Sequence, residues 1–132
     1  MIGIDPGHQA HSNSEQEPVA PGSSDTKKKV SSGTQGRFTG VAEYKVNLQV
    51  ALKLKAILAD LGATVVMTRE THDVDISNSE RAVMLNEAGV SLAIRIHCNG
   101  SDDASRHGAS VLIPSNDCTA SINDASKAAG QC

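Results

Sequence analysis

Three residues of this sequence have the side-chain types of a catalytic metal site: His8, Glu43 and His97. Two imidazoles and one carboxylate form the ligand set of many catalytic zinc sites, which keep a fourth position open for water. Each residue also has an ordinary structural use, because a histidine after a strand often closes a turn and a glutamate in the first turn of a helix interacts favourably with the helix dipole. The residue types and their spacing therefore leave both a metal site and purely structural roles open.

These three residues lie far apart in the sequence, so secondary-structure elements must bring them together. Met1–Ile4 is an apolar run followed by a turn that contains His8, which predicts a buried strand. Residues 91–97 predict another strand, which ends at His97. Glu43 begins an amphipathic pattern, with apolar residues recurring every three or four positions, which predicts a helix. Because ligands of parallel sheets bind at the carboxyl ends of the strands, we expect the three residues to meet there.

The alternation of strands and helices predicts an α/β fold with a mainly parallel, twisted sheet flanked by helices. The other expected elements are a strand at 63–68, a helix from a cap at Ser77 or Ser79 to about residue 88, a strand at 109–113 and the start of a helix at 123–130. Residues 9–42 are rich in Ser, Gly, Pro, Thr and charged residues, which predicts a long surface loop beside the site.

Composition and charge exclude several classes of function. Hydrophobic residues make up 39% of the 132 residues and charged residues 20%, as in ordinary globular domains. The net charge of -3 and the aromatic content of 2% disfavour nucleic acid as a partner. No run approaches the roughly 18–20 apolar residues that span a bilayer, so we expect no transmembrane segment in this sequence.

A set of short motifs adds to this reading, because their order and spacing resemble a known family. The motifs are Ile4-Asp5-Pro6-Gly7-His8, Glu43 at a helix start, Thr68-Arg69 at a strand end, Ser79-Glu80-Arg81 with Asn86, and Ile96-His97-Cys98-Asn99 followed by Gly108. Asp-Pro-Gly-His alone is a weak signal, but the whole series is specific. Across roughly residues 2–113, the sequence resembles the zinc-dependent N-acetylmuramoyl-L-alanine amidases.

The resemblance implies a bound Zn²⁺ with His8, Glu43 and His97 as its ligands. It also implies the substrate, which is the amide between the lactyl group of N-acetylmuramic acid and L-alanine in peptidoglycan. An enzyme with this substrate is expected to be exported to the bacterial cell wall or beyond it.

Three polar residues of the motifs are candidates for contacts with the substrate. Arg69 and Arg81 could bind the carboxylates of a peptide stem, or they could pair with neighbouring acidic residues. Asn99 could donate a hydrogen bond to the substrate, or it could hold the turn in which it lies. The remaining histidines, His11, His72 and His107, are expected in polar, solvated turns, and Cys98 is expected to be buried.

The sequence also departs from the family pattern. The segment between His8 and Glu43 is long, and Arg95 stands where a small serine is common. The family carries its general-base glutamate on a late strand, so we expect this residue beyond Cys132 and residues 1–132 to form a single, partial catalytic domain. Two alternatives remain: a zinc peptidase with another substrate, and a catalytically inactive, zinc-containing peptidoglycan-binding module. Nothing in the sequence indicates the oligomeric state.

Overall fold

The computed structural model describes residues 1–103, 105–113 and 126–130. The chain forms two compact units, Met1–Gly100 and Ser101–Cys132. The three candidate metal ligands belong to the first unit. No helix in the described ranges is long and apolar enough to span a membrane.

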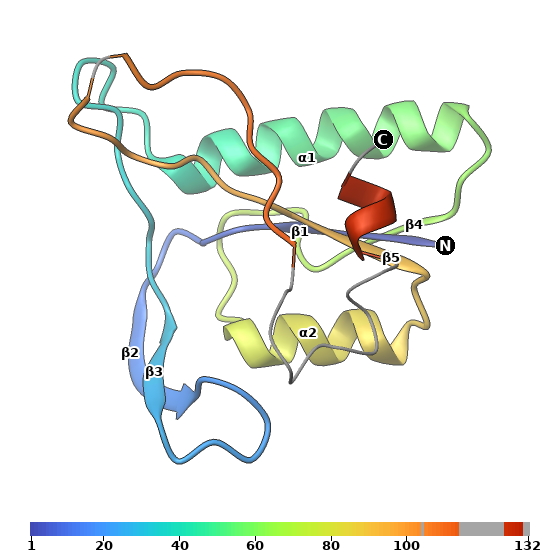
Figure 1. The fold of residues 1–132 in the computed structure, drawn as a ribbon, viewed down its shortest axis with the longest axis horizontal. Coiled ribbons are helices and arrows are strands. Elements are labelled where there is room, and N and C mark those ends of the chain that lie inside the picture. The colour runs from blue at the N-terminus through green and yellow to red at the C-terminus, as the bar shows by residue number, and fades with distance from the viewer. Residues whose placement is uncertain (104, 114–125, 131–132) are drawn as a thin grey trace. The chain divides into compact units, whose positions relative to one another are not determined.

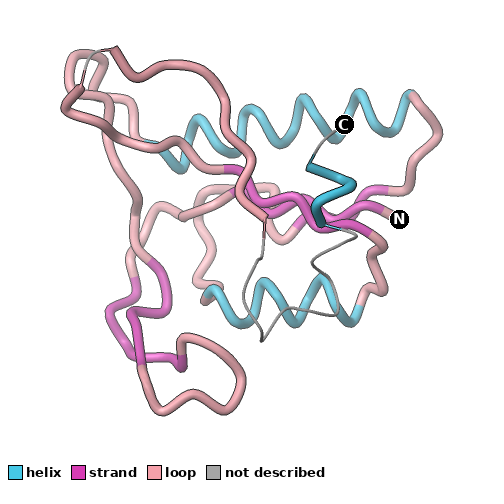
Figure 2. Tube along the Cα trace, viewed as in Figure 1, coloured by secondary structure: helices cyan, strands magenta, loops and turns pink. Residues whose placement is uncertain are grey.

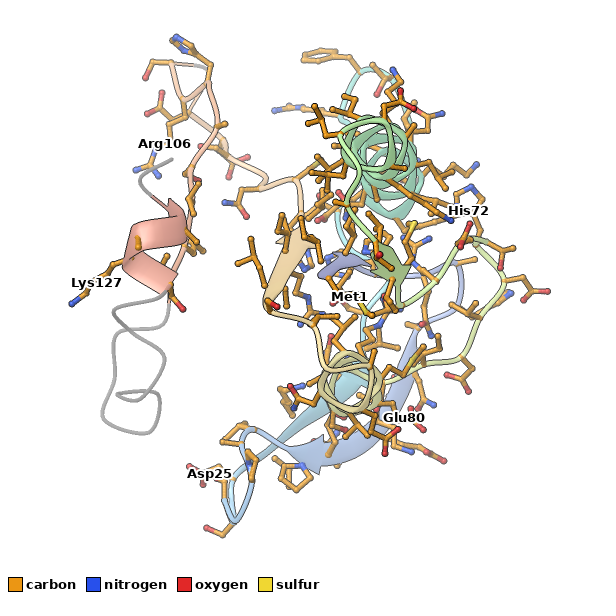
Figure 3. All side chains as sticks on the ribbon, turned by 90° about the vertical axis from the view of Figure 1, so that its right-hand side faces the viewer. Met1, Asp25, His72, Glu80, Arg106 and Lys127 are labelled. Carbon is orange, nitrogen blue, oxygen red and sulfur yellow. The ribbon has the colours of Figure 1, made fainter. Side chains whose placement is uncertain are left out.

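The first unit is built around a three-stranded parallel sheet in the order β4-β1-β5. β1 (Ile2–Pro6) is the central strand and pairs with both β4 (Val65–Met67) and β5 (Leu92–Ile96). Helix α1 (Glu43–Asp60) lies over one face of the sheet and α2 (Asn78–Glu87) over the other (Figures 1 and 3). The predicted α/β fold with a mainly parallel sheet is therefore confirmed.

The core of this unit is formed where the helices pack on the central strand. Ile4 in β1 and Ala51 in α1 are fully buried, and Leu48 of α1 and Leu85 of α2 are almost so. Helix α2 begins with a capping box in which the Ser77 hydroxyl accepts from the backbone N–H of Glu80 and the Glu80 carboxylate accepts from the N–H of Ser77. This capping box identifies Ser77 as the N-cap of α2, whereas the sequence left Ser77 and Ser79 as alternative caps.

The segment 9–42, predicted as a long surface loop, contains a β-hairpin. β2 (Asn13–Pro18) and β3 (Thr26–Val30) pair in antiparallel fashion, as Figure 2 shows. Lys27 and Lys29 of β3 form ion pairs with Glu17 and Glu15 of β2. Cross-strand pairs of opposite charge stabilise a hairpin without an apolar alternation, so the hydrophobic pattern of the sequence does not reveal these strands.

Glu17 attaches the hairpin to helix α2 through its carboxylate. The side chain is buried and accepts from the backbone N–H and hydroxyl of Ser79 at the start of α2, as well as from Lys27. Burial raises the pKa of Glu17, but the hydrogen bonds from Lys27 and Ser79 outweigh it and lower the pKa to about 2. Glu17 is therefore ionised at neutral pH and holds the hairpin against α2.

Replacing Glu17 by glutamine is expected to lower the free energy of unfolding by about 1–3 kcal/mol, because charge-assisted hydrogen bonds to a buried carboxylate are lost. Equilibrium unfolding in urea measures this change. Glu15→Gln is the matched control, since Glu15 pairs with Lys29 but is 70% exposed, and its effect should stay below about 1 kcal/mol. Equal effects of the two substitutions would contradict the anchoring role of Glu17.

In the second unit, the predicted strand at 109–113 is wrong. Residues 109–113 have no regular secondary structure, and Val111 and Leu112 are 69% and 88% exposed. An apolar run becomes a strand only where a neighbouring strand pairs with its backbone, and no strand pairs with these residues in the described part of the chain. Of the helical start expected at 123–130, residues 126–130 are helical, and 123–125 lie outside the described residues.

Candidate metal centre

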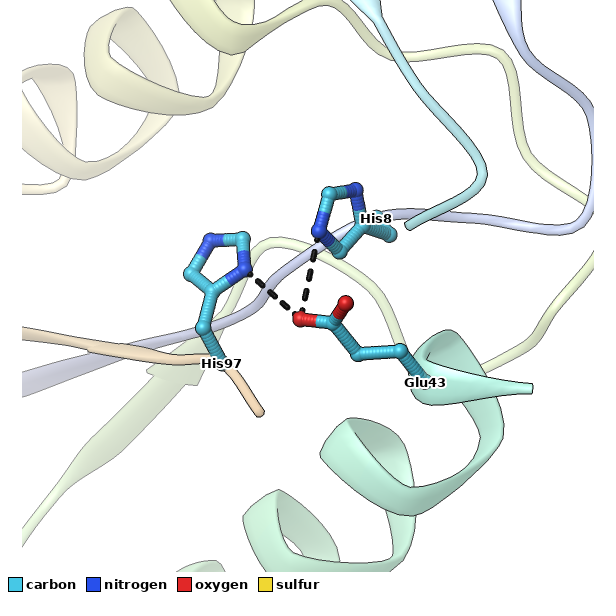
Figure 4. A group of neighbouring side chains, drawn as sticks. All are labelled: His8, Glu43 and His97. Carbon is cyan, nitrogen blue, oxygen red and sulfur yellow. Dashed lines mark hydrogen bonds and ion pairs between the residues drawn. The ribbon is translucent and has the colours of Figure 1, made fainter. Parts of the chain in front are cut away.

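His8, Glu43 and His97 converge at one edge of the parallel sheet, as Figure 4 shows. His8 follows β1, Glu43 is the first residue of α1, and His97 directly follows β5. Oε1 of Glu43 lies 3.2 Å from Nε2 of His8 and 3.1 Å from Nδ1 of His97. The two imidazole rings meet edge to face with their centroids 4.6 Å apart. The sequence therefore correctly indicated which three side chains the fold would bring together.

The spacing of these atoms fits a small tetrahedral metal ion. Ligand bonds of about 2.0–2.1 Å to a tetrahedral zinc ion place neighbouring ligand atoms about 3.3 Å apart. The two distances from Glu43 Oε1 lie close to this value, and one donor atom from each residue lies within 4.8 Å of the others. The donor set of two nitrogens and one oxygen is also one that zinc commonly accepts.

The carboxylate of Glu43 is buried and accepts hydrogen bonds on both oxygens. Oε2 accepts from the backbone N–H and the hydroxyl of Thr34, both at 2.8 Å, and Oε1 accepts from the backbone N–H of Cys98 at 3.0 Å. Burial raises the pKa of Glu43, but these hydrogen bonds outweigh it and lower the pKa to about 2. The site therefore keeps a negative charge at any physiological pH, which favours a cation between the histidines.

His8 is fixed both by its side chain and by an unusual backbone conformation. Its Nδ1 lies 2.9 Å from the carbonyl oxygen of Ser31, which can only accept, so Nδ1 carries the proton and Nε2 presents a lone pair. Its backbone φ of 62° lies in the left-handed region, which non-glycine residues seldom adopt. Unusual backbone angles of this kind concentrate at functional sites.

The surroundings of His97 favour its neutral form, the form that binds metals. Burial lowers its pKa, and Arg95 and His8 add to this effect, while the hydrogen bond to Glu43 acts in the opposite direction. The ring packs directly on the backbone of Gly7, where a Cβ atom would lie 2.4 Å from it. Glycine at this position of the Asp-Pro-Gly-His motif therefore leaves the space that the imidazole occupies.

Arg69 and Arg81, predicted as possible substrate contacts, lie in the interior at 3% and 1% exposure. Arg69 donates to main-chain carbonyl oxygens of Pro6, Gly7, Tyr44 and Thr71. Arg81 donates to the carboxylate of Asp5, the side-chain oxygen of Gln9 and the carbonyl oxygens of Pro6, His8 and Ile76. These contacts hold the turn that carries His8, so we propose that both arginines support the site rather than bind substrate.

Arg69 remains charged in this setting. Burial lowers its pKa to about 10, and the neighbouring Arg81 adds to the shift while Asp5 opposes it. The alternative from the sequence, pairing with the acids next to Arg69, is not what the structure shows: Glu70 pairs with Lys55, and Asp73 lies 3.6 Å from His11. A substrate contact remains a prediction only for Asn99, which is exposed two residues after His97.

Two residues that sequence reasoning missed complete the surroundings of the site. Asn47 is fully buried and donates to the carbonyl oxygen of Gly7 and, at 3.4 Å, to Oε1 of Glu43. Its position, one turn after Glu43 on the buried face of α1, was the available signal. Nothing in the sequence around Thr34 indicated its contact with Glu43.

Cys98, expected to be buried, is exposed, and its thiol contacts the side-chain oxygen of Asn47 at 3.3 Å.

The other histidines lie apart from the three ligands. A polar depression lined by residues 11–15 and 73–75 includes His11 but none of the three ligands. His72 packs edge to face on Tyr44, and burial together with Arg69 and Lys45 lowers its pKa. His72 is thus half-buried rather than solvated as predicted, whereas His107 is exposed.

Comparison with known proteins identifies the family. The model of the family described as N-acetylmuramoyl-L-alanine amidase (Amidase_3) matches residues 2–131. Among solved structures, the chain is similar to the N-acetylmuramyl-L-alanine amidase Ami1 from Mycobacterium smegmatis, with 28% identity and a TM-score of 0.70 over 78% of this chain and 48% of that one. The apo form of Ami1 from Mycobacterium abscessus gives 27% identity and a TM-score of 0.68 over 76% and 48%.

A third structure, the CwlD amidase from Clostridioides difficile in complex with the GerS lipoprotein, shares 17% identity and therefore supports the fold alone, with a TM-score of 0.64 over 98% of this chain and 62% of that one. No curated protein matches the chain. The chain spans about half the length of the Ami1 structures that it resembles. The match of the family model over nearly all of its residues shows that the chain belongs to the N-acetylmuramoyl-L-alanine amidase family.

Proposed function

We propose that this protein is a zinc-dependent peptidoglycan amidase that hydrolyses the bond between N-acetylmuramic acid and L-alanine. The observation that carries the proposal is the convergence of His8, Glu43 and His97, in a geometry that fits zinc, within a chain of this family. An enzyme with this substrate would act outside the cytoplasm, at the bacterial cell wall or beyond it.

In this proposal, the residues of the chain would bind the metal ion and orient the substrate. Nε2 of His8, Oε1 of Glu43 and a ring nitrogen of His97 would hold the ion on one side. A bound zinc ion supplies Lewis-acid polarisation of the scissile carbonyl and activation of water near neutral pH. Asn99, exposed beside His97, would orient the substrate through its amide. The buried carboxylate of Glu43 is ionised at neutral pH, because its pKa is about 2.

Glu43 does not serve as the general base, since both of its oxygens are occupied by hydrogen-bond donors and Oε1 faces the histidines. We propose, as the resemblance implies, that a glutamate other than Glu43 takes the proton from water and passes it to the leaving amine. A general acid–base group of this kind typically contributes about 10²–10⁴-fold to the rate.

The expected activity of the zinc-loaded full-length protein on purified peptidoglycan is hydrolysis that leaves a carboxylate on the lactyl group of the glycan strand and a new amino group on L-alanine of the released peptide stem. Dinitrophenylation followed by hydrolysis identifies the residue that carries each new amino group. A chelator should abolish the release, and added zinc should restore it, because the three ligands hold the ion that activates water.

The same assay separates the alternatives. A peptidase would free the amino groups of other stem residues or cleave ordinary peptides. A binding module would sediment with peptidoglycan and release nothing. Either result would contradict the amidase proposal, although family membership favours the amidase over the peptidase.

A further inference from the structure

We infer that the four residues Ser31–Thr34, between the hairpin and α1, form a positioning segment that selects which atoms of His8 and Glu43 face the metal. The inference rests on the proposed zinc site. The segment follows β3 directly, Ser31 and Thr34 hydrogen-bond to a proposed ligand, and a Cβ atom at Gly33 would clash with His8 and Glu43. None of the three is itself a ligand, so each would act through His8 or Glu43.

Ser31 selects the nitrogen of His8. Its carbonyl oxygen lies 2.9 Å from Nδ1, and its hydroxyl lies 3.1 Å from the same atom. Because the carbonyl oxygen only accepts, it requires the proton on Nδ1 and leaves the lone pair on Nε2. Nε2 is the atom that faces Glu43 Oε1, so the tautomer set by Ser31 is the one that can bind an ion at this place.

Thr34 selects the oxygen of Glu43. Its N–H and hydroxyl both donate to Oε2 at 2.8 Å, and its carbonyl oxygen in turn accepts from the backbone N–H of Glu43 at 2.9 Å. This closed set of three hydrogen bonds holds the carboxylate with Oε2 turned away and only Oε1 directed at the histidines. Binding through one oxygen suits four-coordinate zinc, whereas calcium favours more oxygen ligands and often a bidentate carboxylate.

Gly33 allows the segment to approach both ligands at once. Its φ of 81° lies in the left-handed region, and a Cβ atom there would lie 2.6 Å from Cδ2 of His8 and 2.8 Å from Oε2 of Glu43. Any side chain at this position must displace His8, Glu43 or the segment. The hairpin holds the segment in this place, because Asn78 of α2 donates to the carbonyl oxygen of Lys29 at 2.7 Å and Glu17 binds Ser79.

The test compares Gly33→Ala with Gly22→Ala in the full-length protein. Both glycines have a positive φ, of 81° and 77°, but a Cβ at Gly22 meets nothing within 4 Å. The shared backbone strain should lower the melting temperature of both metal-free variants, and the close contacts of the new Cβ at position 33 should lower that of Gly33→Ala further. Zinc dissociation constants, measured by competition with a chromophoric chelator, should rise about 10–100-fold for Gly33→Ala, the range for residues that support a ligand. Gly22→Ala should change them less than threefold.

A second pair of variants does not disturb the backbone. Thr34→Val removes only the hydroxyl bond to Oε2 and should raise the zinc dissociation constant about tenfold, while Thr34→Ser should restore it. Thr39→Val is the matched control, because the Thr39 hydroxyl accepts from the backbone N–H of Val41 instead of donating to a proposed ligand. Since Thr34 is exposed, the melting temperature of the metal-free protein should change little.

The outcomes separate this inference from the proposed function. Tight zinc binding by the wild type with unchanged affinity in Gly33→Ala and Thr34→Val would overturn the positioning role and leave the zinc site standing. Failure of the wild type to bind zinc would overturn both. A loss of affinity that simply follows the loss of melting temperature across all five variants would also overturn the positioning role, because it would indicate general destabilisation.

Discussion

Replacing Glu43 by glutamine is expected to weaken zinc binding by more than 100-fold, beyond the range of residues that only support a ligand. The substitution removes the negative charge that the site keeps at all physiological pH values. The two donors on Thr34 would hold the remaining oxygen at the Oε2 position, so the new amide group would point at His8 and His97 with no lone pair to offer. Isothermal titration with zinc measures the loss.

Glu70→Gln is the matched control for this experiment. Glu70 is 55% exposed and pairs with Lys55 on the surface, so removal of its charge should leave the zinc affinity within about twofold. Near-wild-type zinc binding by Glu43→Gln would show that the carboxylate is not a ligand. Zinc would then bind without Glu43, and the proposed ligand set would be wrong.

Replacing Arg81 by methionine is expected to lower the free energy of unfolding by about 3–5 kcal/mol, the usual effect of removing one partner of a buried ion pair. Nη1 of Arg81 lies 2.8 Å from Oδ1 of Asp5, and the guanidinium also donates to the carbonyl oxygens of Pro6, His8 and Ile76. Methionine fills the space but leaves these acceptors without their donor. Urea unfolding followed by circular dichroism measures the change.

Arg95→Met is the control, because Arg95 binds the other oxygen of the same carboxylate, 3.1 Å away, but is 43% exposed. Its loss should change the free energy of unfolding by less than about 1 kcal/mol. If the two variants were equally stable, burial of the Arg81–Asp5 pair would not be what stabilises the turn that carries His8.

The sequence predicted the elements whose residues follow a clear hydrophobic pattern. The strands at the start of the chain, near 65 and near 94, and the two long helices all lie within a few residues of their expected places. His8, Glu43 and His97 could be found because each lies at the end or the start of such an element. Parallel strands bring their carboxyl ends together, so the topology by itself implied that the three residues would meet.

The remainder depends on contacts that no local pattern reveals. The hairpin is stabilised by Lys27 with Glu17 and by the attachment of Glu17 to Ser79, 62 residues further along the chain. Burial of Arg69 and Arg81 contradicts the usual surface location of arginine, because interior carbonyl oxygens supply the partners. Thr34 lacks any sequence signal, since its role depends on the position of the hairpin.

The left-handed backbone at His8 bears on how such a chain evolves. Glycine would adopt a φ of 62° at lower free energy than histidine, so selection for folding alone would favour glycine at this position. In a lineage that no longer needed the metal, a change of His8 to glycine would be an early sign of lost activity, appearing while the sheet and both helices were still intact.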